Sequence, residues 1–135
     1  MSGLVLKLAP GERVLVNGAV IENGDRRARI AVKTADANIL RLRDALHPDA
    51  VTTPVRRVCY IAQLVLSGDA EPQEARPQLL RGIEQLSRAL RDGDSRTHLD
   101  AATQGVLDGQ FYQALKSLRA LLPREARLME TAGSS

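Results

Sequence analysis

The fold of this chain is limited most strongly by a block near the N-terminus, residues 17–29, where two Asn-Gly pairs stand six residues apart and three arginines follow. Asn and Gly accept the positive φ that tight turns require, and apolar residues flank the turns. The block therefore predicts a small strand meander with a cationic surface. Its turns would be shaped by Asn17, Gly18, Asn23 and Gly24.

Apolar residues alternate with polar ones on both sides of this block, and period-two spacing between turn residues is typical of strands. In the last strand we expect Leu40 and Leu42 to face inward, so that Arg41 and Arg43 face outward. The pattern predicts strands over residues 4–8, 13–16, 19–22, 28–33 and 39–43.

From residue 53 onward apolar residues recur at helical spacing. Thr53 is a suitable N-cap and Pro54 suits the first helical position, while Ser67-Gly68 should end this helix. Residues 69–77 contain two prolines and several acids, which predicts a loop or a helix entry. Three more helices are expected, from Leu79 to about Arg91, from a cap at Asp94 or Ser95 to Gly109, and from Phe111 to a stop at Pro123.

The predicted fold is therefore α+β. A small antiparallel β meander or barrel-like sheet over residues 1–46 is followed by a bundle of about four α-helices over residues 53–130, and residues 131–135 form a disordered tail. Because so small a sheet is poorly stable alone, it should pack on the helices, pair with another copy, or both. Its exposed edges would favour strand pairing in a homodimer.

The residues that usually carry chemistry are sparse. The two histidines, His47 and His98, lie far apart, and no Cys/His cluster has metal-ligand spacing. Cys59 stands alone on an apolar helix stripe, where we expect an inert core thiol and no disulfide. The sequence thus predicts a protein that is not an enzyme, with no catalytic residue, metal or cofactor. We expect no membrane span or secretory signal, and a cytoplasmic location.

Charge is distributed unevenly along the chain. Residues 1–60 hold ten Lys or Arg and six Asp or Glu, a net charge of +4, whereas residues 61–135 hold nine and ten, a net charge of −1. If the apolar strand residues face inward, the cations between them form a grid on one sheet face, and guanidinium groups suit phosphates. The residues proposed for RNA binding are Arg13, Arg26, Arg27, Arg29, Lys33, Arg41 and Arg43.

A simpler interpretation is a solvated polar face, whose charge is neutralised by Glu12, Glu22, Asp25 and Asp44. Aromatic residues limit the binding mode, because residues 1–59 contain none and RNA-binding sheets usually stack bases on rings. Any RNA contact would then depend on arginine, turn backbone and phosphates.

The helical part offers a second surface. A DNA-reading last helix with Lys116 and Arg119 is conceivable, although Asp94, Asp100 and Asp108 would meet phosphates unfavourably. A helical hairpin could instead present a groove to a partner helix. The residues proposed for partner binding are Arg56, Arg57, Tyr60, Phe111 and Tyr112.

Several runs resemble the FlbT family of flagellar biosynthesis regulators. They are Leu6-Lys7-Leu8-Ala9-Pro10-Gly11-Glu12, Val16-Asn17-Gly18-Ala19-Val20-Ile21, Asn23-Gly24-Asp25-Arg26-Arg27 and Thr53-Pro54-Val55-Arg56-Arg57-Val58, with a weaker likeness in Phe111-Tyr112-Gln113-Ala114-Leu115-Lys116. The sheet is also faintly similar to mRNA-binding carbon storage regulators of the CsrA type, which are strand-swapped dimers. That likeness is carried by Leu6–Leu8, Gly11-Glu12, Arg29-Ile30-Ala31-Val32 and Arg41.

The FlbT resemblance implies a post-transcriptional regulator. Such a protein associates with the 5′ untranslated region of flagellin mRNA and promotes its decay or represses its translation, with reported cases of positive action. The alternative is a protein-interaction adaptor that binds flagellin or a small flagellar chaperone through the helices, so that its effects on mRNA are indirect.

Overall fold

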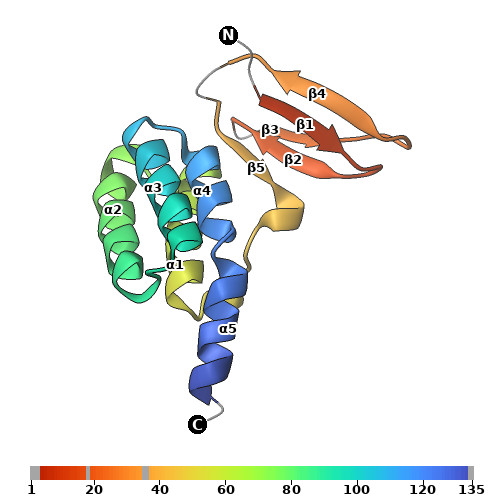
Figure 1. Ribbon diagram of the computed structural model, residues 1–135. Coiled ribbons are helices and arrows are strands. Elements are labelled where there is room, and N and C mark those ends of the chain that lie inside the picture. The colour runs from red at the N-terminus through yellow and green to blue at the C-terminus, as the bar shows by residue number, and fades with distance from the viewer. Residues whose placement is uncertain (1–3, 18, 35–36, 134–135) are drawn as a thin grey trace.

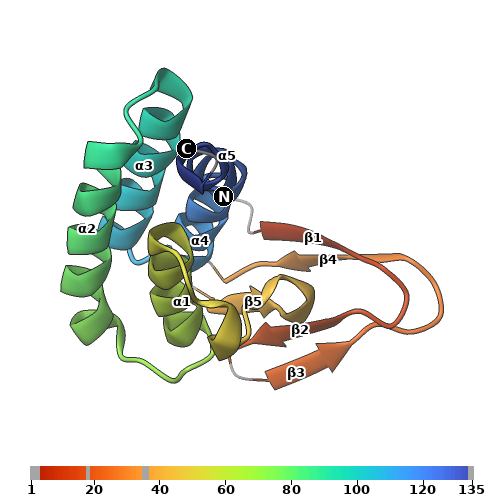
Figure 2. The same ribbon diagram turned by 90° about the horizontal axis from the view of Figure 1, so that it is seen from below.

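The computed structural model describes residues 4–17, 19–34 and 37–133. Five strands form two antiparallel sheets, one of order β1-β4 and one of order β3-β2-β5. Figures 1 and 2 show these sheets on one side of the molecule and the helices on the other. The strands are β1 (Leu4–Leu8), β2 (Arg13–Val16), β3 (Ala19–Glu22), β4 (Ala28–Val32) and β5 (Ile39–Arg41).

The first four strands are one long hairpin that is creased in the middle and folded back on itself. Near the turn, Val16 pairs with Ala19; toward the open end, β1 pairs with β4. Between these paired regions lie residues 9–12 and 23–27, where the ribbon reverses direction (Figure 2). The two halves of the hairpin therefore end up in different sheets.

Polar groups hold this crease. The side-chain amide of Asn23 donates to the carbonyl oxygens of Ala9 and Arg26, each at 2.8 Å. Gly11 has a φ of +71°, and its N–H donates to the Gly24 carbonyl. The second Asn-Gly pair is thus part of the crease, because the strands it joins, β3 and β4, do not pair with each other.

The first Asn-Gly pair does lie between paired strands, as predicted. Asn17 has a φ of 50°, and its side-chain oxygen accepts a hydrogen bond from the Asn38 N–H at 2.9 Å. Asn17 therefore shapes the turn and anchors the start of β5. Gly18, predicted to share this turn, lies outside the described residues.

In the three-stranded sheet, β5 and most of β2 are covered on both faces, whereas β3 is exposed along its length. Its inner face contributes Val14 and Ile39 to a small apolar cluster with Leu6 and Leu8 of β1. Its other face turns Leu40 toward the helical core, with Leu15 packed against that core. This sheet therefore lies between the two-stranded sheet and the helices.

Two short 3-10 turns, η1 (Leu42–Asp44) and η2 (Pro48–Ala50), lead to the helices. The described residues form five α-helices, and the predicted α+β class is confirmed. Their bounds are α1 (Pro54–Leu66), α2 (Pro72–Ala89), α3 (Gly93–Leu107), α4 (Phe111–Arg119) and α5 (Leu122–Gly133).

Caps explain where most of the helices begin. Thr53 caps α1 as predicted, accepting a hydrogen bond from the Arg56 N–H. The cap of α3 is Asp92, earlier than the predicted Asp94 or Ser95. The segment 69–77, predicted as a loop or a helix entry, is a loop up to Glu71 and the first turns of α2 from Pro72 onward. Ala75 there is 2% exposed and extends the apolar stripe of that helix by one turn.

The predicted fourth helix is divided. Helix α4 ends at Arg119 and α5 begins at Leu122, so Pro123 lies in the first turn of a helix, where its missing N–H costs nothing, rather than at a helix end. Glu125 attaches α5 to α1: its carboxylate accepts the Val55 N–H at 2.8 Å and the Thr53 hydroxyl. Helix α5 continues to Gly133, whereas we predicted disorder from residue 131; residues 134 and 135 are outside the described part.

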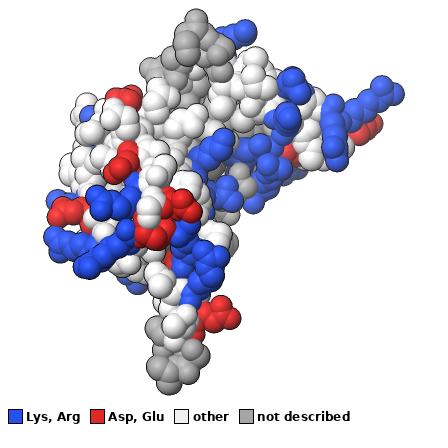
Figure 3. Space-filling model, in the orientation of Figure 1, with Lys and Arg blue, Asp and Glu red and all other residues white. Residues whose placement is uncertain are grey.

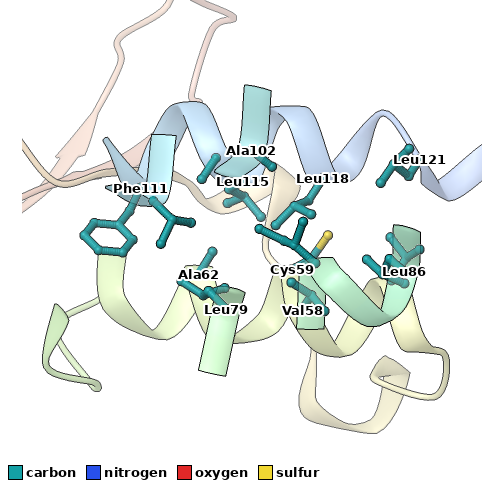
Figure 4. Close-up of a cluster of buried hydrophobic side chains, with 14 of the residues drawn as sticks. Val58, Cys59, Ala62, Leu79, Leu86, Ala102, Phe111, Leu115, Leu118 and Leu121 are labelled. Atoms are coloured by element: carbon teal, nitrogen blue, oxygen red, sulfur yellow. The ribbon is translucent and has the colours of Figure 1, made fainter. Parts of the chain in front are cut away.

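The helices enclose one apolar core, in which α1 packs between α2 and α4 (Figure 4). Gly82 permits the closest approach of α2 to α1, since a Cβ atom there would lie 2.7 Å from Val58 Cγ2. Cys59 lies in this core with no exposed surface, and burial raises its pKa to about 12. Phe111 is also in the core, at 4% exposure, which removes it from the predicted partner-binding surface.

Candidate nucleic-acid interface

The outer face of the two-stranded sheet places like charges opposite each other. In the register of β1 and β4, Lys7 stands opposite Arg29, and both side chains are exposed. Cross-strand neighbours with the same charge destabilise a sheet. Among the described residues neither cation has an ion pair. An arrangement of this kind suits an anionic ligand, which would remove the repulsion.

This face borders an open cleft of about 730 Å³. Figure 3 shows Lys and Arg side chains gathered over the sheets and in the hollow toward the helices. The apolar part of the lining includes Val5, which is 50% exposed, and five cations supply all the charged groups of the lining. The cleft is lined by Val5, Lys7, Leu8, Ala9, Arg27, Ala28, Arg29, Arg41 and Arg43.

Arg41 differs from the prediction that it faces outward and is free to bind. It is 9% exposed, and its guanidinium donates from Nε to Glu12 Oε2 at 2.7 Å and from Nη2 to Glu12 Oε1 at 2.8 Å. The same Nη2 donates to the Lys7 carbonyl at 2.6 Å. Strand β5 is buried on both faces, so simple alternation fails there. Arg41 therefore joins the two sheets beneath the cleft.

Glu12 is the acceptor at the centre of this arrangement. Burial would raise the pKa of its carboxyl, but the Ala9 N–H at 2.9 Å and the cations of Arg41 and Arg43 together lower it below the ordinary value. The carboxylate is thus kept ionised inside the protein, and it fixes one arginine at the floor of the cleft.

Two further arginines of the predicted grid have acidic partners. Arg43, with a side chain 55% exposed, lies 3.6 Å from the Glu12 carboxylate. Leu42, which lies between Arg41 and Arg43, begins η1 and does not continue the strand. Its side chain is 37% exposed, so its predicted inward orientation is wrong. Arg13 pairs with Glu22 directly across β2 and β3, at 2.7 Å and on the surface. The predicted neutralisation of part of the grid is therefore correct for these positions.

The remaining cations of the predicted set stay exposed. Arg26 and Arg27 lie in the crease, Arg29 lies on β4, and Lys33 directly follows that strand. None of the four has an ion pair to a carboxylate in the described part of the chain. Their exposure is compatible with a role in binding, which stays a prediction for these positions.

The basic surface continues onto the helices. A small cavity beside Arg41 is lined by Leu40, Tyr112 and Leu115 together with Lys116 and Arg119 of α4. Tyr112 is half-buried there and packs against both apolar clusters. The fold therefore brings cations from the two ends of the chain to one side of the molecule.

The other predicted partner-binding residues do not form one site. Arg57 is exposed and lines a groove of about 420 Å³ between α1 and α2, with Val58, Ile61 and Arg81. Arg56 and Tyr60 are half-buried, and Arg56 donates to the Ala50 carbonyl.

Two contributors to the cleft were absent from the predicted set. Lys7 could have been found, because the alternation that buries Leu6 and Leu8 places it on the outer face. Glu12, beneath the cleft, was predicted only as one of several neutralising carboxylates; the sequence does not show that its partner is Arg41, which is 29 residues away on β5, the strand that pairs with β2.

No group of three or more metal-binding side chains comes together among the described residues. None of the helices within them has the length and apolar character needed to cross a membrane.

Comparison with known proteins agrees with the resemblance seen in the sequence. The family described as "Flagellar protein FlbT" matches residues 4–129. Proteins of Brucella anthropi, Brucella ovis and Brucella melitensis, each named "Probable flagellum biosynthesis repressor protein FlbT", are 32% identical over 124 residues, covering 92% of this chain and 80% of theirs. No solved structure matches. This chain belongs to the FlbT family of flagellar proteins.

Proposed function

We propose that this chain regulates flagellum biosynthesis after transcription, by binding the 5′ untranslated region of flagellin mRNA and promoting its decay or repressing its translation. Family membership and the repressor names of the relatives support a regulatory role. The proposed binding of RNA rests on one observation: Lys7 and Arg29 stand opposite each other without an acidic partner among the described residues, in a cleft lined by five cations.

The chemistry of the cleft favours contacts to the phosphate backbone. Strands β1 to β5 carry no aromatic side chain on which bases could stack. Arginine forks bind phosphate with paired hydrogen bonds, and lysine adds a point charge. Lys7, Arg27 and Arg29 would therefore hold the RNA, while Arg41 holds the floor beneath them.

The test compares two arginines of the same sheet region. Arg29→Gln removes an unpaired cation, whereas Arg13→Gln removes one already engaged by Glu22. With a flagellin leader RNA, Arg29→Gln should weaken binding several-fold and Arg13→Gln much less. The dependence of affinity on salt should also fall by about 0.7 in logarithmic slope for each phosphate of a single strand that the variant no longer neutralises. Equal weakening in both variants would refute the role of the cleft.

The groove between α1 and α2 supports a second candidate, an adaptor for flagellin or a small flagellar chaperone. Its apolar floor is flanked by Arg57 and Arg81, and no carboxylate lines it. Such a groove suits an amphipathic helix with acidic residues. A gel shift discriminates: if purified protein alone leaves leader RNA unshifted but forms a stable complex with flagellin or chaperone, the adaptor role replaces direct RNA binding.

A further inference from the structure

Strand β3 is an edge strand with an open backbone on its outer side. Asn23 donates its N–H to the Glu12 carbonyl across the β2–β3 ladder. Because hydrogen-bonded and non-hydrogen-bonded pairs alternate along an antiparallel ladder, Ile21 and Ala19 also direct their N–H and C=O toward β2. The corresponding groups of Val20 and Glu22 therefore point away from the sheet.

This edge has little of the protection that usually prevents pairing. Protected edges carry charged side chains, above all lysine, or proline or bulges. Ala19–Glu22 has no lysine or proline, and its one charged residue, Glu22, is already paired with Arg13. All four residues are exposed, including Val20 at 62% and Ile21 at 39%. The free edge of β4, by contrast, carries Arg29 and is followed by Lys33.

We propose that two copies of this chain associate through β3, pairing antiparallel about a twofold axis at Ile21. Since only Val20 and Glu22 offer outward backbone groups, the register that satisfies them places Val20 opposite Glu22 of the second copy and Ile21 opposite its equivalent. A twofold interface uses the same patch on both copies.

Charge favours a second copy in this register. Glu22 is the one charged residue of β3; it faces an apolar side chain across the axis and keeps its own partner, Arg13, at 2.7 Å. No two like charges stand opposite each other in the joined strands. Ile21 lies on the inner face with Val14, so the pairing also covers the apolar border of the small cluster between the sheets.

The pairing also terminates itself, because a twofold interface uses the β3 edge of both copies and leaves no second β3 edge for a third. The joined sheet would have the order β5-β2-β3-β3-β2-β5, and its outer strand β5 has three residues and is followed directly by η1. The result is a closed dimer and not a growing fibre.

Light scattering after size exclusion tests the association. The wild-type chain should elute with twice the 14.7 kDa mass of one copy. Val20→Pro should give a monomer, because proline removes an outward N–H and leaves the β2 ladder intact. Val20→Lys should do the same, while the control Val5→Lys, at an exposed position on β1, should stay dimeric. A wild-type monomer, or a dimer unaffected at Val20, overturns the proposal.

Cysteine crosslinking tests the register and does not depend on the proline variant folding. Cys59, the one cysteine, is fully buried and should not interfere. Ile21→Cys should form an intermolecular disulfide on mild oxidation, because its equivalent lies directly opposite. Val20→Cys, facing Glu22 of the second copy, should not. Equal crosslinking of both, or of neither, refutes the pairing. Since the cleft is not involved, a dimer that binds no RNA would refute only the function proposed above.

Discussion

The helical and β parts of this molecule are held together by different means. The helices bury one continuous apolar core, in which Leu79, Leu118 and Leu121 have no exposed surface. Among its described residues the β part has four buried apolar side chains in its own cluster, and it relies in addition on the Glu12–Arg41 ion pair and the Asn23 amide. We therefore expect the helical part to be the more stable of the two, and it carries the β part that presents the cations.

That difference explains why the candidate site lies where it does. A β part this small buries too little apolar surface to be held together by an apolar core alone, so polar contacts add to its stability. Unpaired cations on its outer face cost stability, and a separate helical core makes the cost tolerable. Local stability should accordingly be lower in the β part, and variants of each part test this, from the largest expected effect to the smallest.

Leu118→Ala should have the largest effect, because Leu118 is fully buried between helices. The missing apolar packing and the cavity left behind should lower the free energy of unfolding by about 4 kcal/mol. Urea unfolding followed by far-ultraviolet circular dichroism measures this. Leu107→Ala, at an exposed position of α3, is the control and should change the free energy by less than about 0.5 kcal/mol. Similar destabilisation of the two variants would contradict a helical core that dominates stability.

Glu12→Ala should have the next largest effect, confined to the β part. It leaves the Arg41 guanidinium buried with only the Lys7 carbonyl and removes the acceptor of the Ala9 N–H. Removing one member of a buried ion pair costs about 3 kcal/mol. Hydrogen exchange should show faster amide exchange in β1, β2 and β5 with little change in α1 to α4. A uniform increase over the whole chain would mean that the two parts unfold as one unit.

Acid should weaken the same ion pair. The pKa of Glu12 is lowered in the folded protein, so its contribution to stability is complete above the ordinary pKa of a glutamate, about 4.3, and is lost as the pH falls through the lower folded value. The protection factors of β-part amides, which are corrected for the pH dependence of chemical exchange, should therefore fall below about pH 4.3. In Glu12→Gln this part of the pH dependence should disappear. If wild type and Glu12→Gln respond alike, other carboxylates cause the acid sensitivity.

Particular residues show where sequence reasoning succeeds and fails. The helix from Pro54, its Thr53 cap and the outward position of Arg29 follow from local rules of capping and alternation, and the structure has them. Alternation misplaces Arg41 because its strand is buried on both faces and its partner comes from a distant loop. The crease at Asn23 has the same Asn-Gly sequence as a hairpin turn, so the motif alone does not tell whether the strands on either side of it pair with each other. The positions of Arg41 and Asn23 depend on contacts between residues far apart in the sequence, and local patterns in a single sequence do not reveal such contacts.

Arg29→Thr should have the smallest effect, and with the opposite sign. Threonine suits a strand, and the change removes the like charge opposite Lys7. The free energy of unfolding should rise by about 0.5 kcal/mol, and the gain should shrink in high salt as screening weakens the original repulsion. Arg13→Thr is the matched control, because it breaks the surface pair with Glu22 and should give no gain. If both variants leave stability unchanged or lower it, Lys7 and Arg29 do not repel each other in solution. The proposal that the face with Lys7 and Arg29 binds a polyanion would then lose its physical basis.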